Sequence, residues 1–292
     1  MTATDAPSPE PPAQTSAAVD WRRLLGLLAL AAALKLGLII LEVVPFNADE
    51  AVVGLMARHI LHGARPLFFY GQAYLGSLDA WLIAGAFAVF GQSVFAIRLV
   101  QLVLYLGTVA TTYALGLKIY RSQWLAGAAA LFMIIPSALV TLYTSATLGG
   151  YGEALLFGNL ILWLGLALLE RGPAVAGPWA GRRWWVGWAL LGLLTGLAFW
   201  TFPITLAYVA PVMVYTVLAL WRQRLRLVVV GSLVAAGFAA GASPWIAYTL
   251  THGAITVAEM TGQVRAPGIH EYEMGAGGAR RTDFFAAARS RG

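Results

Sequence analysis

Long apolar runs alternate with short polar segments along most of this sequence. The first run, Leu24 to Val44, has about 21 residues, and further runs occupy 77–90, 94–117, 122–143, 153–169, 184–201, 204–220 and 227–250. Because about 20 apolar residues cross a hydrocarbon core of about 30 Å, most of these runs predict membrane-spanning helices. The run 77–90 is shorter, and its length is more typical of a helix at the membrane surface.

Ten basic residues that flank the longer runs indicate which of the runs cross. They are Arg22, Arg23, Lys118, Arg121, Arg171, Arg182, Arg183, Arg222, Arg224 and Arg226. If 77–90 stays on the outer surface, all of these residues fall on the inner side, as the positive-inside rule favours. The sequence therefore predicts an all-α membrane bundle over 21–250, with about seven transmembrane helices and a cytoplasmic N-terminus. Two amphipathic helices are expected on the outer surface, within the loop 45–93.

Composition supports a membrane protein and excludes several other classes. The chain is 60% hydrophobic and 11% charged, whereas a soluble domain carries about 25% charged residues. Lys and Arg at the ends of spans account for the net charge of +6, so no nucleic-acid partner is needed. The absence of cysteine excludes disulfides and thiolate metal sites. Residues 1–20, rich in Pro, Ala, Ser and Thr, predict a disordered cytoplasmic tail.

An acidic pair, Asp49 and Glu50, directly follows the first run. It opens a segment in which apolar positions recur with helical spacing, at Val52, Leu55, Met56, His59 and Ile60. Charge at the mouth of a membrane span is costly unless chemistry or a lipid headgroup requires it. In the alternative interpretation Asn47 caps the helix, Glu50 completes a capping box, and Asp49 complements the helix dipole.

The segment 66–81 combines aromatic and small residues, with Gln72 between Tyr70 and Tyr74. Such side chains suit either an aromatic belt at the membrane interface or a pocket for a sugar or headgroup. Asp79 is expected on the wet face of the segment that follows.

Further charged residues lie within the runs or at their ends. Glu153 ends the sequence Gly-Gly-Tyr-Gly-Glu at 149–153, and it is either a site carboxylate or a cap for the next helix. Arg98, near the outer end of its run, could snorkel to the interface. Lys35 and Glu42 lie on about the same face of the first span and could pair or meet a neighbouring helix.

Taken together, these motifs resemble the N-terminal part of a GT-C membrane glycosyltransferase. The resemblance covers about 24–250, and it is nearest to the bacterial family 39-like group, which is related to protein O-mannosyltransferases and the aminoarabinose lipid A transferase. It rests on the acidic pair, the stretch YGQAYLGSL, Phe90-Gly91 and Arg98, the sequence GGYGE, and a turn formed by Arg58, His59, Ile60, Leu61, Gly63 and Pro66.

The resemblance implies an inverting enzyme of the bacterial inner membrane. Such enzymes move a sugar from a polyprenyl-phosphate carrier to a protein, lipid or glycan acceptor on the outer face, without a metal cofactor. Asp49 matches the general base, Glu50 would assist it, and Glu153 matches a second acidic position. The candidate substrate-binding residues are Arg98, which would hold the lipid phosphate, and Tyr70, Gln72, Tyr74, Tyr151 and His59.

Two alternatives stay open. One is a transporter or lipid flippase, which would need polar residues along its spans; this chain instead collects its polar residues at one surface. The other is an inactive fragment of a glycosyltransferase. Relatives in the family run longer, and 251–292 reads as an unpatterned basic tail on the outer face, so the sequence leads us to expect a truncated chain.

Overall fold

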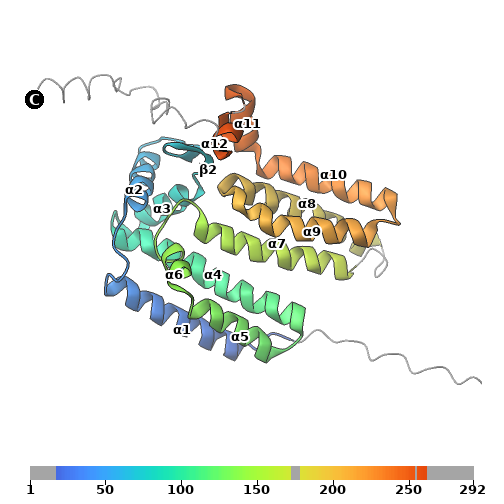
Figure 1. Cartoon of the computed structure of the whole chain (residues 1–292), viewed down its shortest axis with the longest axis horizontal. Coiled ribbons are helices and arrows are strands. Elements are labelled where there is room, and N and C mark those ends of the chain that lie inside the picture. Colours follow the sequence, from blue (N-terminus) through green and yellow to red (C-terminus); the bar gives the residue numbers. More distant parts are fainter. Residues whose placement is uncertain (1–17, 172–177, 254, 262–292) are drawn as a thin grey trace, which may run out of the picture.

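The computed structural model describes residues 18–171, 178–253 and 255–261, and it is almost entirely helical. In this part of the chain, six helices are long and apolar enough to cross a membrane. They lie side by side in a bundle (Figure 1), and they are α1 Trp21–Ile40, α4 Val94–Tyr120, α7 Tyr151–Arg171, α8 Pro178–Thr201, α9 Leu206–Leu220 together with the preceding 3-10 turn Pro203–Thr205, and α10 Arg224–Gly241. The predicted all-α membrane bundle is confirmed.

The predicted span 122–143 is not one continuous helix. It forms α5, Gln123–Ile134, and the short α6, Ala138–Tyr143. Pro136 separates them, because proline lacks an N–H group and disfavours helical geometry at the residue before it. The prediction of about seven spans therefore corresponds to six long helices and one interrupted passage, since α5 and α6 together return the chain to the end at which α7 begins (Figure 1).

Lys35 holds this interrupted passage to α1. Its Nζ donates hydrogen bonds to Thr144 Oγ1 at 2.7 Å and to Ser145 Oγ at 2.6 Å, and the side chain is buried. Of the two alternatives for Lys35, the structure therefore shows the contact with a neighbouring segment. Glu42 lies beyond the end of α1 and is exposed.

The predicted span 227–250 is also divided. Helix α10 ends at Gly241, and α11, Ser243–His252, starts with a proline in its first turn. Helix α12, Ile255–Met260, then packs on the small hairpin, where Glu259 Oε2 accepts a hydrogen bond from the backbone N–H of Ala73 at 2.7 Å. The predicted tails 1–20 and 251–292 fall largely outside the described residues.

Helices α8 and α10 approach closely through glycines spaced four residues apart. Gly192 and Gly196 of α8 face Gly237 and Gly241 of α10. A Cβ atom at any of these positions would overlap backbone atoms of the other helix. Small residues at this spacing are typical of helix pairs that associate in membranes.

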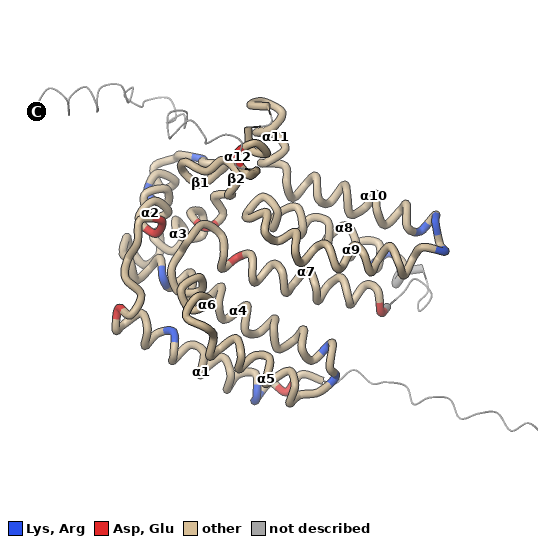
Figure 2. The backbone as a smooth tube through the Cα atoms, viewed as in Figure 1, with Lys and Arg blue, Asp and Glu red and all other residues tan. Residues whose placement is uncertain are grey.

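One end of the bundle carries the segment between α1 and α4. It contains α2 Ala48–Leu61, the antiparallel strands β1 Phe68–Phe69 and β2 Gln72–Gly76, and α3 Leu78–Phe90. Since the chain leaves α1 and enters α4 at this same end, α3 does not cross the bundle (Figure 1), in agreement with the interpretation of 77–90 as a surface segment. Figure 2 shows basic residues gathered at the opposite end, at the turn between α9 and α10. The orientation in the membrane stays a prediction.

The two surface helices differ from the predicted amphipathic pair. The face of α2 that packs on the protein includes Val53, Met56 and Ala57, while Leu55 is exposed. Helix α3 is apolar on nearly all sides, and its one charged residue is buried. Asp79 is buried because α2 and α4 both pack against α3.

Candidate functional site

The start of α2 is fixed by a complete capping box. Asn47 Oδ1 accepts a hydrogen bond from the Glu50 backbone N–H at 3.0 Å, and Glu50 Oε2 accepts one from the Asn47 N–H at 3.3 Å. This arrangement satisfies two backbone donors of the first turn. The capping interpretation of Glu50 is therefore correct, and it sets the geometry of the residue before it, Asp49.

Arg98 pairs with the same carboxylate from α4. Its Nε donates to Glu50 Oε1 at 3.3 Å and its Nη2 donates to Glu50 Oε2 at 3.2 Å. The Glu50 side chain is fully buried and that of Arg98 is 5% exposed. Arg98 therefore does not snorkel to the interface. Its proposed contact with a lipid phosphate stays a prediction, and the structure places its guanidinium on Glu50.

Asp49 is in a different position from its neighbour. It is exposed in the first turn of α2, where the helix dipole favours a negative charge. In the part of the chain that the structure describes, its carboxylate makes no hydrogen bond or ion pair. Of the two adjacent acids, Asp49 is thus the one that remains available to an incoming group.

Asp79 lies in a buried polar cluster at the same end of the bundle, so its expected position on the wet face is wrong. Gln101 Nε2 donates to Asp79 Oδ1 at 3.1 Å and to Thr147 Oγ1 at 3.0 Å, and the Thr147 hydroxyl donates to Asp79 Oδ2. Burial raises the pKa of the Asp79 carboxyl, and the negative charge of Glu50 acts in the same direction. The charge of the Glu50–Arg98 pair therefore influences the buried cluster around Asp79.

Glu153 belongs to this cluster rather than to an open surface. It lies in the first turn of α7, is 1% exposed, and is placed against Asp79. Neither of its carboxyl oxygens has a hydrogen-bond donor among the described residues. Its role in the site stays a prediction, but the structure places it in the interior.

The predicted aromatic residues make contacts through α2, the hairpin and the start of α7. His59 Nδ1 lies 3.0 Å from the Tyr70 hydroxyl, so α2 contacts the hairpin that also carries Gln72 and Tyr74, all of them half-buried. Tyr151 stacks on Tyr143 with ring centroids 4.2 Å apart. Burial raises the pKa of Tyr70 and of Tyr74.

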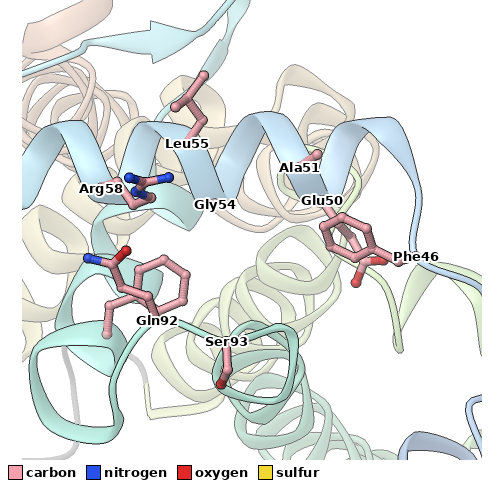
Figure 3. Close-up of a pocket in the computed structure, with 9 residues that line it drawn as sticks. Phe46, Glu50, Ala51, Gly54, Leu55, Arg58, Gln92 and Ser93 are labelled. Atoms are coloured by element: carbon pink, nitrogen blue, oxygen red, sulfur yellow. The ribbon is translucent and has the colours of Figure 1, made fainter.

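A groove of about 410 Å³ runs beside α2, toward the turn that joins α3 to α4. Figure 3 shows Arg58 and Gln92 at one end of the groove, and Phe46 and Glu50 at the other. It is lined by Phe46, Glu50, Ala51, Gly54, Leu55, Arg58, Phe87, Gln92 and Ser93. An apolar wall with a basic and amide-bearing end suits a ligand that is itself part apolar and part anionic.

Three members of the buried cluster were not selected as site residues from the sequence: Asp79, Gln101 and Thr147. A usable signal was present for Gln101, because an amide inside an otherwise apolar span is costly unless it is bonded. As for metals, the described residues contain no group of three His, Cys, Asp or Glu side chains that could hold an ion.

Curated proteins similar to this chain are named as undecaprenyl phosphate aminoarabinose arabinosyl transferases. The chain is 34% identical to the undecaprenyl phosphate-alpha-4-amino-4-deoxy-L-arabinose arabinosyl transferase of Pseudomonas aeruginosa over 149 residues, which are 50% of this chain and 25% of that protein. It is 30% identical to arabinosyl transferase 1 of Pseudomonas fluorescens over 203 residues, 68% of this chain and 34% of that protein.

The matches span about a quarter to a third of the length of these relatives. No protein-family model matches the chain, and no solved structure matches it significantly. The chain is therefore a homologue of the undecaprenyl phosphate aminoarabinose transferases, and it fits a GT-C membrane glycosyltransferase.

Proposed function

We propose that this chain acts in transferring a sugar from an undecaprenyl phosphate-linked donor to an acceptor. The reaction takes place at the outer face of the bacterial inner membrane, and Asp49 is its general base. The observation that carries the proposal is the contrast between the two adjacent acids. Glu50 is buried, belongs to the capping box and is paired with Arg98, whereas Asp49 is exposed at the N-terminus of α2. The named activity of the relatives supports the class of reaction.

The proposed reaction is a single displacement. The acceptor oxygen forms a bond to the anomeric carbon, the bond from that carbon to the phosphate oxygen breaks, and its electron pair leaves with the lipid phosphate. The acceptor proton moves to the Asp49 carboxylate. Because no enzyme-linked intermediate forms, the configuration at the anomeric carbon inverts, as in other single displacements at sugars. No metal ion is required in this scheme.

Glu50 and Arg98 support this reaction as positioning residues. Their ion pair joins α4 to the first turn of α2, and the capping box fixes the backbone on which Asp49 stands. Positioning is critical in such a step, because a misplacement of about 1 Å can reduce the rate about 100-fold.

We further propose that the groove beside α2 receives the headgroup region of a membrane lipid acceptor. Arg58 and Gln92 can bind a phosphate, and Leu55 and Phe87 can contact an apolar chain. Arg58 is nine residues beyond Asp49 on α2, and nine residues of helix span about 13 Å. A phosphate bound at Arg58 would therefore be too far from Asp49 to be the leaving group, so this end of the groove fits the acceptor better than the donor.

The stereochemistry of the product tests the proposed mechanism. The purified full-length protein is incubated in vesicles with the α-linked undecaprenyl phosphate aminoarabinose named for the relatives and with extracted bacterial lipids, and the anomeric configuration of the product is determined by NMR. A β-linked product is expected. An α-linked product would require a double displacement and would contradict the single step, and the absence of transfer would contradict the proposed activity.

A further inference from the structure

The hydrogen bonds around Asp79 have a fixed direction. Gln101 Nε2 donates to both Asp79 and Thr147, so the Thr147 oxygen is already an acceptor and its own proton points to Asp79. Two donors, one on each carboxyl oxygen, therefore face Asp79, which is an environment that favours an ionised carboxylate.

Glu153 has the opposite environment. Both of its oxygens are buried and receive no hydrogen bond from the described residues, and the neighbouring side chain is Asp79, which can only accept when it is ionised. Two buried carboxylates side by side repel each other, and an ionised carboxylate without donors is strongly unfavourable in the interior.

Among the described residues, no basic side chain forms an ion pair with either acid. The ion pairs of the described residues join Arg23 to Asp20, Arg98 to Glu50 and Lys118 to Glu170. Glu50 of α2 adds further negative charge to the surroundings of Asp79, although Arg98 balances it. The donors around Asp79 present hydrogens where a metal ion would need lone pairs, which disfavours a cation at this position.

We propose that Glu153 is a neutral carboxylic acid that donates its proton to the ionised Asp79, and that this pair anchors the segment 144–150 and the start of α7 to α3 and α4. A single proton on Glu153 gives Asp79 a third donor and leaves one negative charge in the cluster. The anchored segment includes Gly149 and Gly150, which both have positive φ angles, 77° and 92°.

This assignment makes Asp79 and Glu153 positioning residues rather than a second base. Glu153 cannot accept a proton while it already carries one, and its burial keeps it from the acceptor. Through the start of α7 the pair holds Tyr151, which stacks on Tyr143 and contacts Phe202 edge to face. The assignment does not depend on glycosyl transfer, so it can fail or succeed independently of the proposed function.

Infrared spectroscopy tests the assignment directly. At pH 7.5, exposed carboxyls are ionised, so a C=O band of a neutral carboxylic acid reports a buried one. We expect this band in the purified protein in a detergent without ester groups. It should disappear in Glu153→Gln, whose amide can still donate to Asp79, and persist in Glu42→Gln, an exposed carboxylate used as the control. In Asp79→Asn it should persist at a higher frequency, because the strong acceptor is lost.

A second measurement needs no variant. Labelling the wild-type protein with glutamate that carries carbon-13 in its carboxyl group should shift the band, whereas labelling aspartate in the same way should not. The absence of a band in the unlabelled protein would overturn the proposal, as would a band that follows aspartate or one that persists in Glu153→Gln. Loss of the band together with a stoichiometrically bound metal ion would assign the cluster to a cation instead.

Discussion

Arg98 donates hydrogen bonds to both carboxylate oxygens of Glu50, and both side chains are buried. The two residues are 48 positions apart and belong to α4 and α2. Because Glu50 also closes the capping box of α2, a single carboxylate connects the start of the surface helix with a long apolar helix of the bundle. The exposed Asp49 directly precedes Glu50 in α2, so this connection also fixes the backbone of Asp49.

Removing either partner of the pair should destabilise the protein more than removing both. We expect Arg98→Met and Glu50→Gln each to lower the free energy of unfolding, by about 3–5 kcal/mol where a buried charge is left alone. The double variant should recover much of that loss. Denaturant unfolding in detergent measures the effect, and losses that simply add would show that the two side chains are not coupled.

The buried carboxyl cluster should make the stability of the protein depend on pH. The pKa of Asp79 is raised above its ordinary value of 3.8, and the buried pair of Asp79 and Glu153 keeps one proton in the folded state that both carboxyls have released in the unfolded state. Stability is then complete below about pH 4 and falls as the pH rises through the folded-state pKa, by up to about 1.4 kcal/mol per pH unit for one proton.

The double variant Asp79→Asn with Glu153→Gln removes both titrating groups, so its stability should decline less above pH 4 than that of the wild type. Unfolding curves at a series of pH values provide the comparison, since all other carboxyls are common to the two proteins. Parallel curves would show that the cluster holds no extra proton in the folded state.

Close packing of α8 on α10 should depend on the lack of a side chain at Gly196. A Cβ there would overlap the carbonyl of Phe238, so Gly196→Ala should force the helices apart and cost about 1–3 kcal/mol. Gly231→Ala on α10, where no atom lies within 4 Å of the added carbon, is the matched control and should be neutral or slightly stabilising. Thermal unfolding that ranks the two variants equally would contradict this account of the interface.

Much of the fold could be predicted because each element carries its own signal. Apolar length predicted the long helices, the 14-residue run predicted a segment that does not cross, and Asn47 with Glu50 predicted the cap. The interruption at Pro136 was also visible in the sequence, but hydropathy averages over a single proline. The amphipathic pattern of α2 identified Val52, Met56 and Ile60, which pack on the protein, but it also included Leu55, which is exposed.

The arrangement of the site could not be predicted in the same way. The pairing of Arg98 with Glu50 and the contact of Asp79 with Gln101 and Thr147 join residues far apart in the chain. Hydrophobic periodicity shows which side of a helix is apolar, but it does not show which other element covers a charged residue. Asp79 was therefore expected in water, although Gln101 of α4 and Thr147 enclose it.

The exchange of Asp49 for Asn tests the central claim most directly, because it removes proton acceptance and keeps the size of the side chain. In vesicles containing undecaprenyl phosphate-linked aminoarabinose and bacterial lipids, we expect Asp49→Asn to reduce the rate of transfer by about 10²–10⁴-fold, with helix content unchanged. Glu42→Gln, an exposed acid seven residues earlier, should transfer at the wild-type rate. Transfer by Asp49→Asn at the wild-type rate would contradict the assignment of Asp49 as the base and would leave it only a role at the start of α2.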